Sequence, residues 1–361
     1  MKVAILTYYN VHNHGSSLQA FGLKRVLENL NCDVSFLTFD RNYDFIPKEN
    51  SKKYKLDMSS IGFFVKYMFE RGADNILFNL KKRNVLNIFT RNNLPVSGRY
   101  SDFEGDLVVI GSDEVFSVEV GINPFFYGVG LKASKVISYA ASFGPTTKEL
   151  IEKRKLGGML RGCIGDLDAI SVRDQNSKNL VSFYTGQSPA LVVDPVILYG
   201  YKDEQKQFRP QDDNYIIVYS YDKNFNDKET SGIIKKYARE HGYRVYSIGY
   251  YHRWCDKNIC PDPIEMLGYF KNAKIVVTDT FHGAVVSLIT ETQFVVKISG
   301  NKNKLEFLLS EYSLDNRIMD NIKQFEDVAE KKIDYEKVNS LLEENRQHSI
   351  EFLKDNMVEI C

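Results

Sequence analysis

Two residues of this chain, Arg173 and His282, have side chains suited to binding and transforming a small anion. A guanidinium grips carboxylate or phosphate as a fork, and an imidazole donates or takes a proton near neutral pH. Arg173 follows the apolar run 169–172, and His282 follows the apolar run 275–277 and a polar turn. If both runs are strands of facing sheets, the two side chains meet in one cleft. Such a pair suits a donor that carries two or three negative charges.

The turn before His282 is the most informative stretch. Residues 275–277 are β-branched and apolar, which predicts a buried strand, and a helix with apolar Val285, Leu288 and Ile289 follows. His282 is thus expected where a strand passes into a helix N-terminus, a place that favours anions in open α/β sheets. Gly283 would let a ligand approach the backbone closely. The alternative is an ordinary capped helix with a surface histidine.

The elements that must position these residues form two α/β alternations. We expect an N-terminal Rossmann-like domain over 1–197, a polar linker over 198–213 and a C-terminal Rossmann-like domain over 214–333. Residues 334–361 are predicted to form a C-terminal helix with an apolar stripe, which would dock on the first domain or on another protomer. The fold class is therefore α/β, with two facing domains and a cleft between them.

Residues 41–100 interrupt the first alternation and read as a helical insertion. The stretch carries twelve Lys/Arg against five Asp/Glu, and it contains two runs rich in Phe, Leu and Ile, at 61–69 and 76–89. Packed helices with a solvated basic face are the simpler interpretation. The alternative is a peripheral contact with an anionic bilayer surface.

The bulk composition excludes several classes of protein. Lys+Arg and Asp+Glu both number 47, so no overall charge draws the chain to nucleic acid. The five cysteines are scattered, and no second pair completes a zinc site, so we expect no metal. No apolar run is long enough for a transmembrane helix, and the short polar-ended start is no signal peptide. We expect a cytoplasmic protein.

Two polar loops follow predicted strands in the first domain. Residues 10–15 follow the first strand, and a helix predicted to be capped by Ser16 or Ser17 comes next. Gly111, Ser112 and Asp113 follow the buried run 107–110. These side chains can bind hydroxyls, although Asp113 can equally serve as a structural cap. The first loop lacks the G-x-G-x-x-G pattern, so we expect no dinucleotide site.

Four short motifs in register resemble those of the polysaccharide pyruvyl transferase family. They are Asn13-His14-Gly15-Ser16-Ser17-Leu18-Gln19-Ala20, Gly111-Ser112-Asp113-Glu114-Val115-Phe116, Ser171-Val172-Arg173-Asp174 with Val193-Asp194-Pro195-Val196, and Thr278-Asp279-Thr280-Phe281-His282-Gly283-Ala284. The resemblance spans roughly residues 1–320. The family usually has a tyrosine where this chain has His14 and often has arginine near Lys302 and Lys304.

The resemblance implies a fold similar to the GT-B arrangement and an enzyme. It implies transfer of the pyruvyl group of phosphoenolpyruvate to two sugar hydroxyls, as a cyclic ketal with release of phosphate, in surface or capsular polysaccharide synthesis. The acceptor would be a nucleotide sugar or a lipid-linked oligosaccharide, and no cofactor is needed. The alternatives are a GT-B glycosyltransferase that uses a nucleotide sugar and a non-catalytic sugar-binding relative.

Roles for individual residues follow from that resemblance. Arg173 is expected to bind the carboxylate or phosphate of the donor, and His282 to be the general acid or an anion contact. The positions expected to bind the donor are Gly283, Lys302 and Lys304. The positions expected to face the acceptor or the cleft are Asn13, His14, Gly15, Gln19, Gly111, Ser112 and Asp113.

Overall fold

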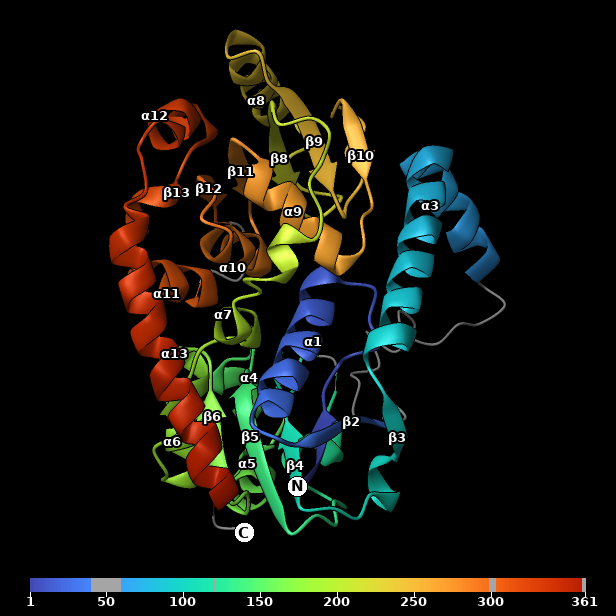
Figure 1. Ribbon diagram of the computed structural model, residues 1–361. Coiled ribbons are helices and arrows are strands. Elements are labelled where there is room, and N and C mark those ends of the chain that lie inside the picture. Colours follow the sequence, from blue (N-terminus) through green and yellow to red (C-terminus); the bar gives the residue numbers. More distant parts are fainter. Residues whose placement is uncertain (40–59, 120, 299–302, 359–361) are drawn as a thin grey trace.

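The computed structural model describes residues 1–39, 60–119, 121–298 and 303–358. Within these ranges the chain forms two parallel sheets, one below the other in Figure 1, with helices packed around each. The fold class predicted from the sequence, two α/β halves that face each other, is confirmed.

The first sheet has the strand order β3-β2-β1-β4-β5-β6-β7 in the described part of the chain. Strand β4 is apolar and completely buried, and β1 is buried from Val3 to Leu6, because helices cover both faces of the sheet. Strand β1 pairs with β2 on one side and with β4 on the other, so the strand order reverses between β1 and β4. The strands are β1 Lys2–Leu6, β2 Asp33–Thr38, β3 Val96–Arg99, β4 Leu107–Ile110, β5 Lys135–Ala141, β6 Ala169–Val172 and β7 Ala190–Leu191.

The second sheet repeats this plan with the order β10-β9-β8-β11-β12-β13 among the described residues. Strand β8 pairs with β9 and with β11, so the order reverses between β8 and β11. The strands are β8 Tyr215–Tyr219, β9 Arg244–Ile248, β10 Lys257–Ile259, β11 Ile275–Thr278, β12 Phe294–Lys297 and β13 Ile318–Met319. Ligands of open parallel sheets bind at such reversals, outside the carboxyl ends of the strands.

The helices follow the strands as the alternation predicts, with two local corrections. The α-helices are α1 His14–Asn29, α3 Ser60–Asn93, α4 Lys148–Lys153, α5 Gly157–Gly165, α6 Gln175–Thr185, α7 Pro195–Tyr199, α8 Lys228–Glu240, α9 Pro263–Asn272, α10 Phe281–Ile289, α11 Asn303–Glu311, α12 Phe325–Ala329 and α13 Tyr335–Val358. Short 3-10 turns lie at Tyr100–Asp102, Pro124–Tyr127, Glu204–Lys206, Asp315–Arg317 and Ile322–Gln324.

The first correction concerns the cap of α1, which is Asn13 and not a serine. Asn13 has an extended backbone, and its side chain accepts hydrogen bonds from the N–H groups of Gly15 and Ser16. Ser16 instead donates its hydroxyl to Asp113 at 3.0 Å. The second correction concerns the helical insertion predicted over 41–100, because residues 96–99 form strand β3 of the first sheet. Helix α10 begins at Phe281 with Thr280 as its cap, so it includes His282 in its first turn, as the sequence predicts.

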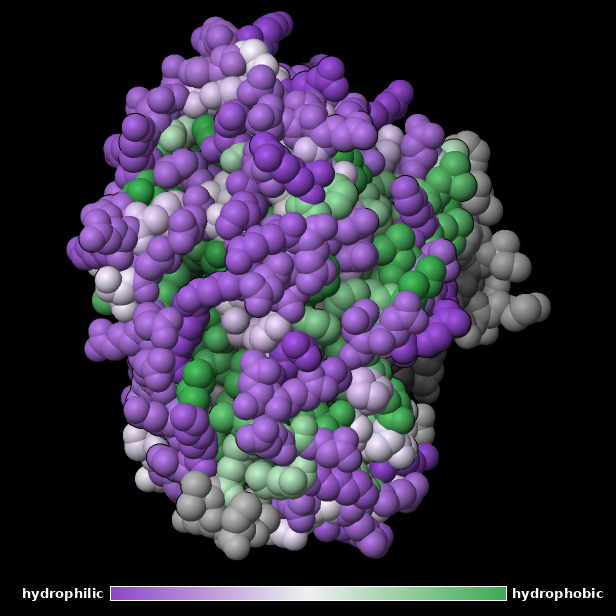
Figure 2. Space-filling view, viewed as in Figure 1, coloured by the Kyte–Doolittle hydropathy of each residue, from purple (hydrophilic) through white to green (hydrophobic). Residues whose placement is uncertain are grey.

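Helix α3 is the part of the predicted insertion over 41–100 that the structure describes as helical. Helix α3 covers both predicted runs and is interrupted at Gly72, where φ is 75°. Its inner face reaches the second half of the molecule: the ammonium of buried Lys82 lies 4.1 Å from the ring centroid of Tyr250. Its outer face exposes Leu77 and Leu80, and Figure 2 shows apolar side chains gathered along this helix. Within the described ranges no helix combines the length and apolar content needed to cross a membrane.

Helix α13 is the predicted C-terminal helix, and it joins the two halves. Near its start, the hydroxyl of Tyr335 donates to the carbonyl of Thr292 in the second half. Further along, the hydroxyl of Ser349 accepts from the N–H of Val193 in the first half. The apolar stripe therefore packs along this chain's own two halves, as Figure 1 shows for the red helix. Residues 198–213, predicted as a linker, include a 3-10 turn whose Gln205 contacts Ile289.

Candidate active site between the two sheets

A pocket of about 360 Å³ lies where the reversal points of the two sheets face each other. Loops after β1, β4 and β5 form one wall, and loops after β8, β9 and β11 together with the start of α11 form the other. The pocket therefore occupies the place that the strand order favours for a ligand. It is lined by Asn13, Ser16, Asp113, Glu114, Pro145, Tyr219, Tyr221, Tyr250, Asp279, Thr280, Phe281, His282, Lys304 and Leu305.

Arg173 lies behind this pocket and does not line it. Its side chain is 1% exposed and binds two carboxylates, Asp194 at 2.7 Å and Asp113 at 3.2 Å. It also donates to the side-chain oxygen of Gln19 at 2.6 Å. Burial lowers the pKa of the guanidinium, but these carboxylates outweigh burial and raise it, so it stays charged. The fork of Arg173 is thus directed at residues of the first half, where it organises the loops after β1, β4 and β7.

The loop after β4 places Asp113 between this arginine and the pocket. Asp113 has φ 80° and Gly111 has φ 117°, and a Cβ on Gly111 would lie 2.3 Å from the carbonyl oxygen of Tyr139. The buried hydroxyl of Ser112 donates to Gln19 at 2.7 Å. Burial raises the pKa of Asp113, but Arg173 and the neighbouring groups outweigh burial and hold it below its usual value. Asp113 is therefore an anion at the wall of the pocket.

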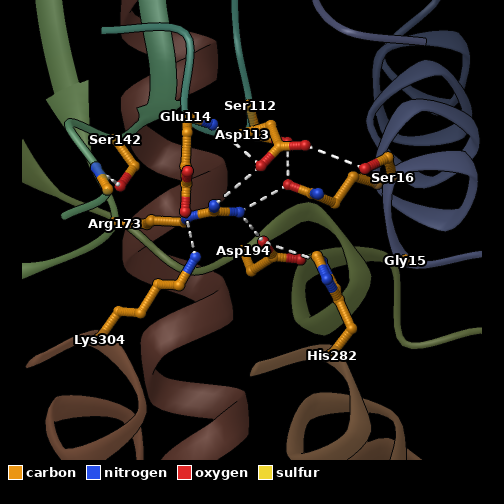
Figure 3. A network of polar contacts seen from close by, with 12 residues as sticks. Gly15, Ser16, Ser112, Asp113, Glu114, Ser142, Arg173, Asp194, His282 and Lys304 are labelled. Atoms are coloured by element: carbon orange, nitrogen blue, oxygen red, sulfur yellow. Dashed lines mark hydrogen bonds and ion pairs between the residues drawn. The ribbon is translucent and has the colours of Figure 1, made fainter. Parts of the chain in front are cut away.

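His282 brings the second half of the chain to the same network (Figure 3). Its Nε2 lies 3.9 Å from the Oδ2 atom of Asp194, the same oxygen that binds Arg173. The ring packs on the backbone of Gly15, where a Cβ would lie 2.3 Å from the ring. Burial lowers the pKa of His282 to about 4, although Asp194 opposes this shift. At neutral pH the imidazole is therefore uncharged.

Lys304 closes the pocket from α11. Its ammonium binds Glu114 of the first half at 2.5 Å and lies 5.7 Å from the ring centroid of Phe281. Phe281 in turn covers the guanidinium of Arg173, at 5.1 Å. This ion pair and the Asp194–His282 contact both cross from one half to the other. Lys302, the other predicted donor contact, lies outside the described residues.

Two predicted site residues point away from the pocket. His14 is fully buried, and its Nε2 donates to the carbonyl of Pro261 at 2.9 Å. Burial lowers its pKa to about 3. The N–H of Gly283 donates to the Thr280 cap at 2.9 Å, and a Cβ at this position would lie 2.1 Å from the hydroxyl of Thr278. His14 thus packs the two halves together, and Gly283 permits close helix–strand packing.

Sequence reasoning assigned no role to several residues of the site. Asp194 belongs to the motif at 193–196. Its position directly after a predicted strand was the feature of the sequence that indicated a site residue. Glu114 follows Asp113 in another motif. Asp279 lies in the motif at 278–284 and so gave the same kind of signal as Asp194. Tyr221 and Tyr250 gave a weaker signal, because the strand order of the second sheet is what brings the ends of β8 and β9 to one wall.

These features define an α/β protein of the GT-B type with a polar pocket between its halves. Trehalose-6-phosphate synthase, OtsA, is similar to this chain over 99% of each chain, with a TM-score of 0.51 at 11% identity. UDP-GlcNAc 2-epimerase from Methanocaldococcus jannaschii has a TM-score of 0.49 at 12% identity and covers 92% of this chain and 93% of its own. At such identities the likeness concerns the fold alone.

The family follows from the sequence itself. The family model described as polysaccharide pyruvyl transferase matches residues 13–299, which is well over half of the chain and includes Arg173 and His282. The chain belongs to this family. No curated protein matches it.

Proposed function

We propose that this protein transfers the pyruvyl group of phosphoenolpyruvate to two hydroxyls of a sugar, as a cyclic ketal, in the synthesis of a surface or capsular polysaccharide. Membership in the family supports the class of reaction. The observation that carries the proposal is the position of His282, an uncharged imidazole at the pocket wall beside the buried carboxylate of Asp194. A base of this kind can accept the proton of an attacking hydroxyl.

The reaction balances with phosphoenolpyruvate and a sugar diol alone. The methylene carbon of the donor gains a proton, and a sugar hydroxyl adds to the carbon that bears the phosphate ester. The C–O bond to phosphate then breaks, and the second hydroxyl adds to the same carbon. Of the two hydroxyl protons lost, one is matched by the proton gained at the methyl carbon and the other by the released phosphate or solvent. The proposed step requires no further cofactor.

His282 is proposed to take the proton of the attacking hydroxyl. The sequence favoured a general acid or an anion contact, but a pKa of about 4 leaves the imidazole uncharged at neutral pH, so it can accept a proton there and holds none of the extra charge that an imidazolium acid would carry. Once protonated, the imidazolium would face the Asp194 carboxylate across 3.9 Å, in a buried site where the attraction is strong. Asp194 is thus proposed to orient His282 and to stabilise its charged form.

Lys304 is the described cation that we propose contacts the donor. It lines the pocket, and its ammonium forms an ion pair with Glu114. Thr280 and Phe281, at the N-terminus of α10, line the pocket beside it, where a helix favours an anion. Arg173 is reassigned in this proposal: it positions Asp113 and Asp194 instead of binding the donor.

The test is release of phosphate from phosphoenolpyruvate with a panel of sugar acceptors, followed by mass spectrometry of the acceptors. We expect an acceptor-dependent release and the mass gain of one pyruvate ketal. Substituting His282→Ala should lower the rate ~10²–10⁴-fold. Exposed His348 on α13 provides the control, because His348→Ala leaves the pocket untouched.

One result would favour the alternative function. The GT-B fold is shared with trehalose-6-phosphate synthase, and a glycosyltransferase would bind a uridine nucleotide. Binding of uridine diphosphate without binding or turnover of phosphoenolpyruvate would therefore contradict the proposed donor. A cytoplasmic location and a peripheral membrane contact through α3 stay predictions of the same proposal. The exposed Leu77 and Leu80 support the membrane contact.

A further inference from the structure

One wall of the pocket is built from tyrosines whose positions are held by one another. Tyr221 follows β8, and its ring lies 5.4 Å from that of Tyr250 at an interplanar angle of 71°. Tyr250 is buried and lies 5.2 Å from the ring of Tyr219, while Lys82 covers it at 4.1 Å. Tyr221 is nevertheless 51% exposed. An exposed aromatic ring in a fixed orientation offers a flat apolar surface within a polar pocket.

Carboxylates surround this surface. Asp113, Glu114 and Asp279 line the pocket, whereas Lys304 is the cation of the described lining and is bound by Glu114. Desolvation of the phenol and the charges of Glu114, Asp279 and Asp113 all raise the pKa of Tyr221, so its hydroxyl lies within the field of these carboxylates. The side chain of Asn224 donates to Asp279 at 2.5 Å and so orients that carboxylate toward the same wall.

The two features together select a type of ligand. Carboxylate oxygens accept hydrogen bonds from hydroxyl groups, and a fixed aromatic ring packs on the C–H face of a sugar ring. A carboxylate or a phosphate on that sugar would be repelled by the like charges of Asp113, Glu114 and Asp279, with Arg173 and Lys304 offsetting part of the repulsion at Asp113 and Glu114. Lys304 lies within this acidic lining, because its ammonium binds Glu114, and the start of α10 directly follows Asp279.

We propose that Tyr221, Tyr250 and Asp279 form an acceptor subsite specific for an uncharged pyranose, with Tyr221 as its stacking surface and Asp279 as a hydroxyl acceptor. This inference rests on the proposed function for the identity of the reaction, but it concerns a binding preference that is measured without turnover. It assigns residues outside every predicted site position.

The test compares pairs of methyl glycosides that differ only at C6. Methyl glucoside, galactoside and mannoside, and the methyl uronide that corresponds to each, are titrated separately into the protein by calorimetry. Each titration is made with and without phosphoenolpyruvate, and the dissociation constants of each pair are compared. We expect at least one neutral glycoside to bind about tenfold or more tightly than its uronide. Equal or tighter binding of the uronides, or no binding of any neutral glycoside under either condition, would overturn the proposal.

Two variants and one control locate the preference. Tyr221→Ala should weaken the binding of the neutral glycoside about tenfold. Asp279→Asn should reduce the ratio between the affinities for the neutral glycoside and for its uronide. Phe183 is similarly exposed, at 55%, and does not line the pocket. Phe183→Ala should therefore change neither the affinity for the neutral glycoside nor the preference for it over the uronide. Unchanged affinities in both pocket variants would refute the subsite.

The same experiment separates this proposal from the proposed function. If neutral sugars bind with these preferences but phosphoenolpyruvate is neither bound nor consumed, the donor assignment fails and the subsite stands. If ketal forms on a uronic acid as readily as on a neutral sugar, the donor assignment stands and the subsite is wrong.

Discussion

Substituting Gly15→Ala tests whether the contact between the two halves at His282 matters for the reaction. A Cβ on Gly15 would lie 2.3 Å from two atoms of the imidazole, whereas ordinary contacts begin at 3.4 Å. The ring must therefore move by roughly 1 Å, and such a displacement of a reacting group costs ~10²-fold in rate. The ring would also shift relative to Asp194, its 3.9 Å neighbour.

The effect on stability is expected to be smaller than the effect on rate. Forcing an extra methyl group into a packed site costs ~1–3 kcal/mol, but Gly15 lies in helix α1, where alanine is favoured by up to ~1 kcal/mol. We therefore expect the free energy of unfolding to fall by about 0–2 kcal/mol. Urea unfolding measures this value, and phosphate release from phosphoenolpyruvate measures the rate.

A double variant and a control make this prediction specific. Adding His282→Ala to Gly15→Ala removes the clash. The double variant should therefore be at least as stable as the single variant His282→Ala, and its rate should be no lower than the rate of that single variant. Gly162 lies in helix α5 with nothing within 4 Å of an added Cβ, so Gly162→Ala should leave the rate unchanged. Wild-type turnover by Gly15→Ala would refute the reasoning.

Three further predictions concern the buried charges. Asp194→Asn should lower kcat far more than it raises KM, by ~10²-fold or more, because it removes the carboxylate beside His282; a steady-state analysis in which KM alone changes would contradict this. Arg173→Lys should lower the free energy of unfolding by ~3–5 kcal/mol, because one ammonium cannot bridge two carboxylates. The same substitution should change KM for phosphoenolpyruvate less than it changes kcat. A change in KM as large as the change in kcat would instead indicate that Arg173 contacts the donor. Because folded-state pKa values of about 4 for His282 and about 3 for His14 lie below the usual 6.5, the unfolded chain binds more protons in this window, and stability should fall as pH drops from 6.5 toward 4. His282→Asn should reduce that loss by ~3 kcal/mol, and urea unfolding at pH 7 and near pH 4 measures it; an unchanged slope would show that His282 titrates normally.

Much of the fold could be predicted because its strands are short, apolar and separated by helical periods. The run 275–278 and the polar turn after it placed His282 at a helix start, which the structure confirms within the first turn of α10. Between β5 and β6 the chain forms two short helices, α4 and α5, in place of one continuous helix, because Lys155 between them adopts φ 57°. Helical periodicity does not reveal such a single left-handed residue.

The site was predicted only in outline, for a physical reason. Arg173 and His282 do share one network. The carboxylates that bind Arg173 are distant in sequence, however, because Asp194 lies 21 residues after it and Asp113 lies 60 residues before it. Partners at such separations depend on strand order, which hydrophobic patterns do not specify. Likewise, nothing local in the sequence tells whether His14 faces the pocket or, as found, Pro261 on the opposite half.

The central claim is that an uncharged His282, beside Asp194 in the pocket between the two halves, takes the proton of a sugar hydroxyl that attacks phosphoenolpyruvate. The most direct measurement is the pH dependence of kcat/KM for ketal formation, with mass spectrometry of the acceptor as the readout. The account predicts that activity in the wild type persists well below pH 6.5 and falls as pH approaches 4, and that His282→Ala lacks this acid limb. Ketal formation by His282→Ala at the wild-type rate, with the same pH profile, would contradict it.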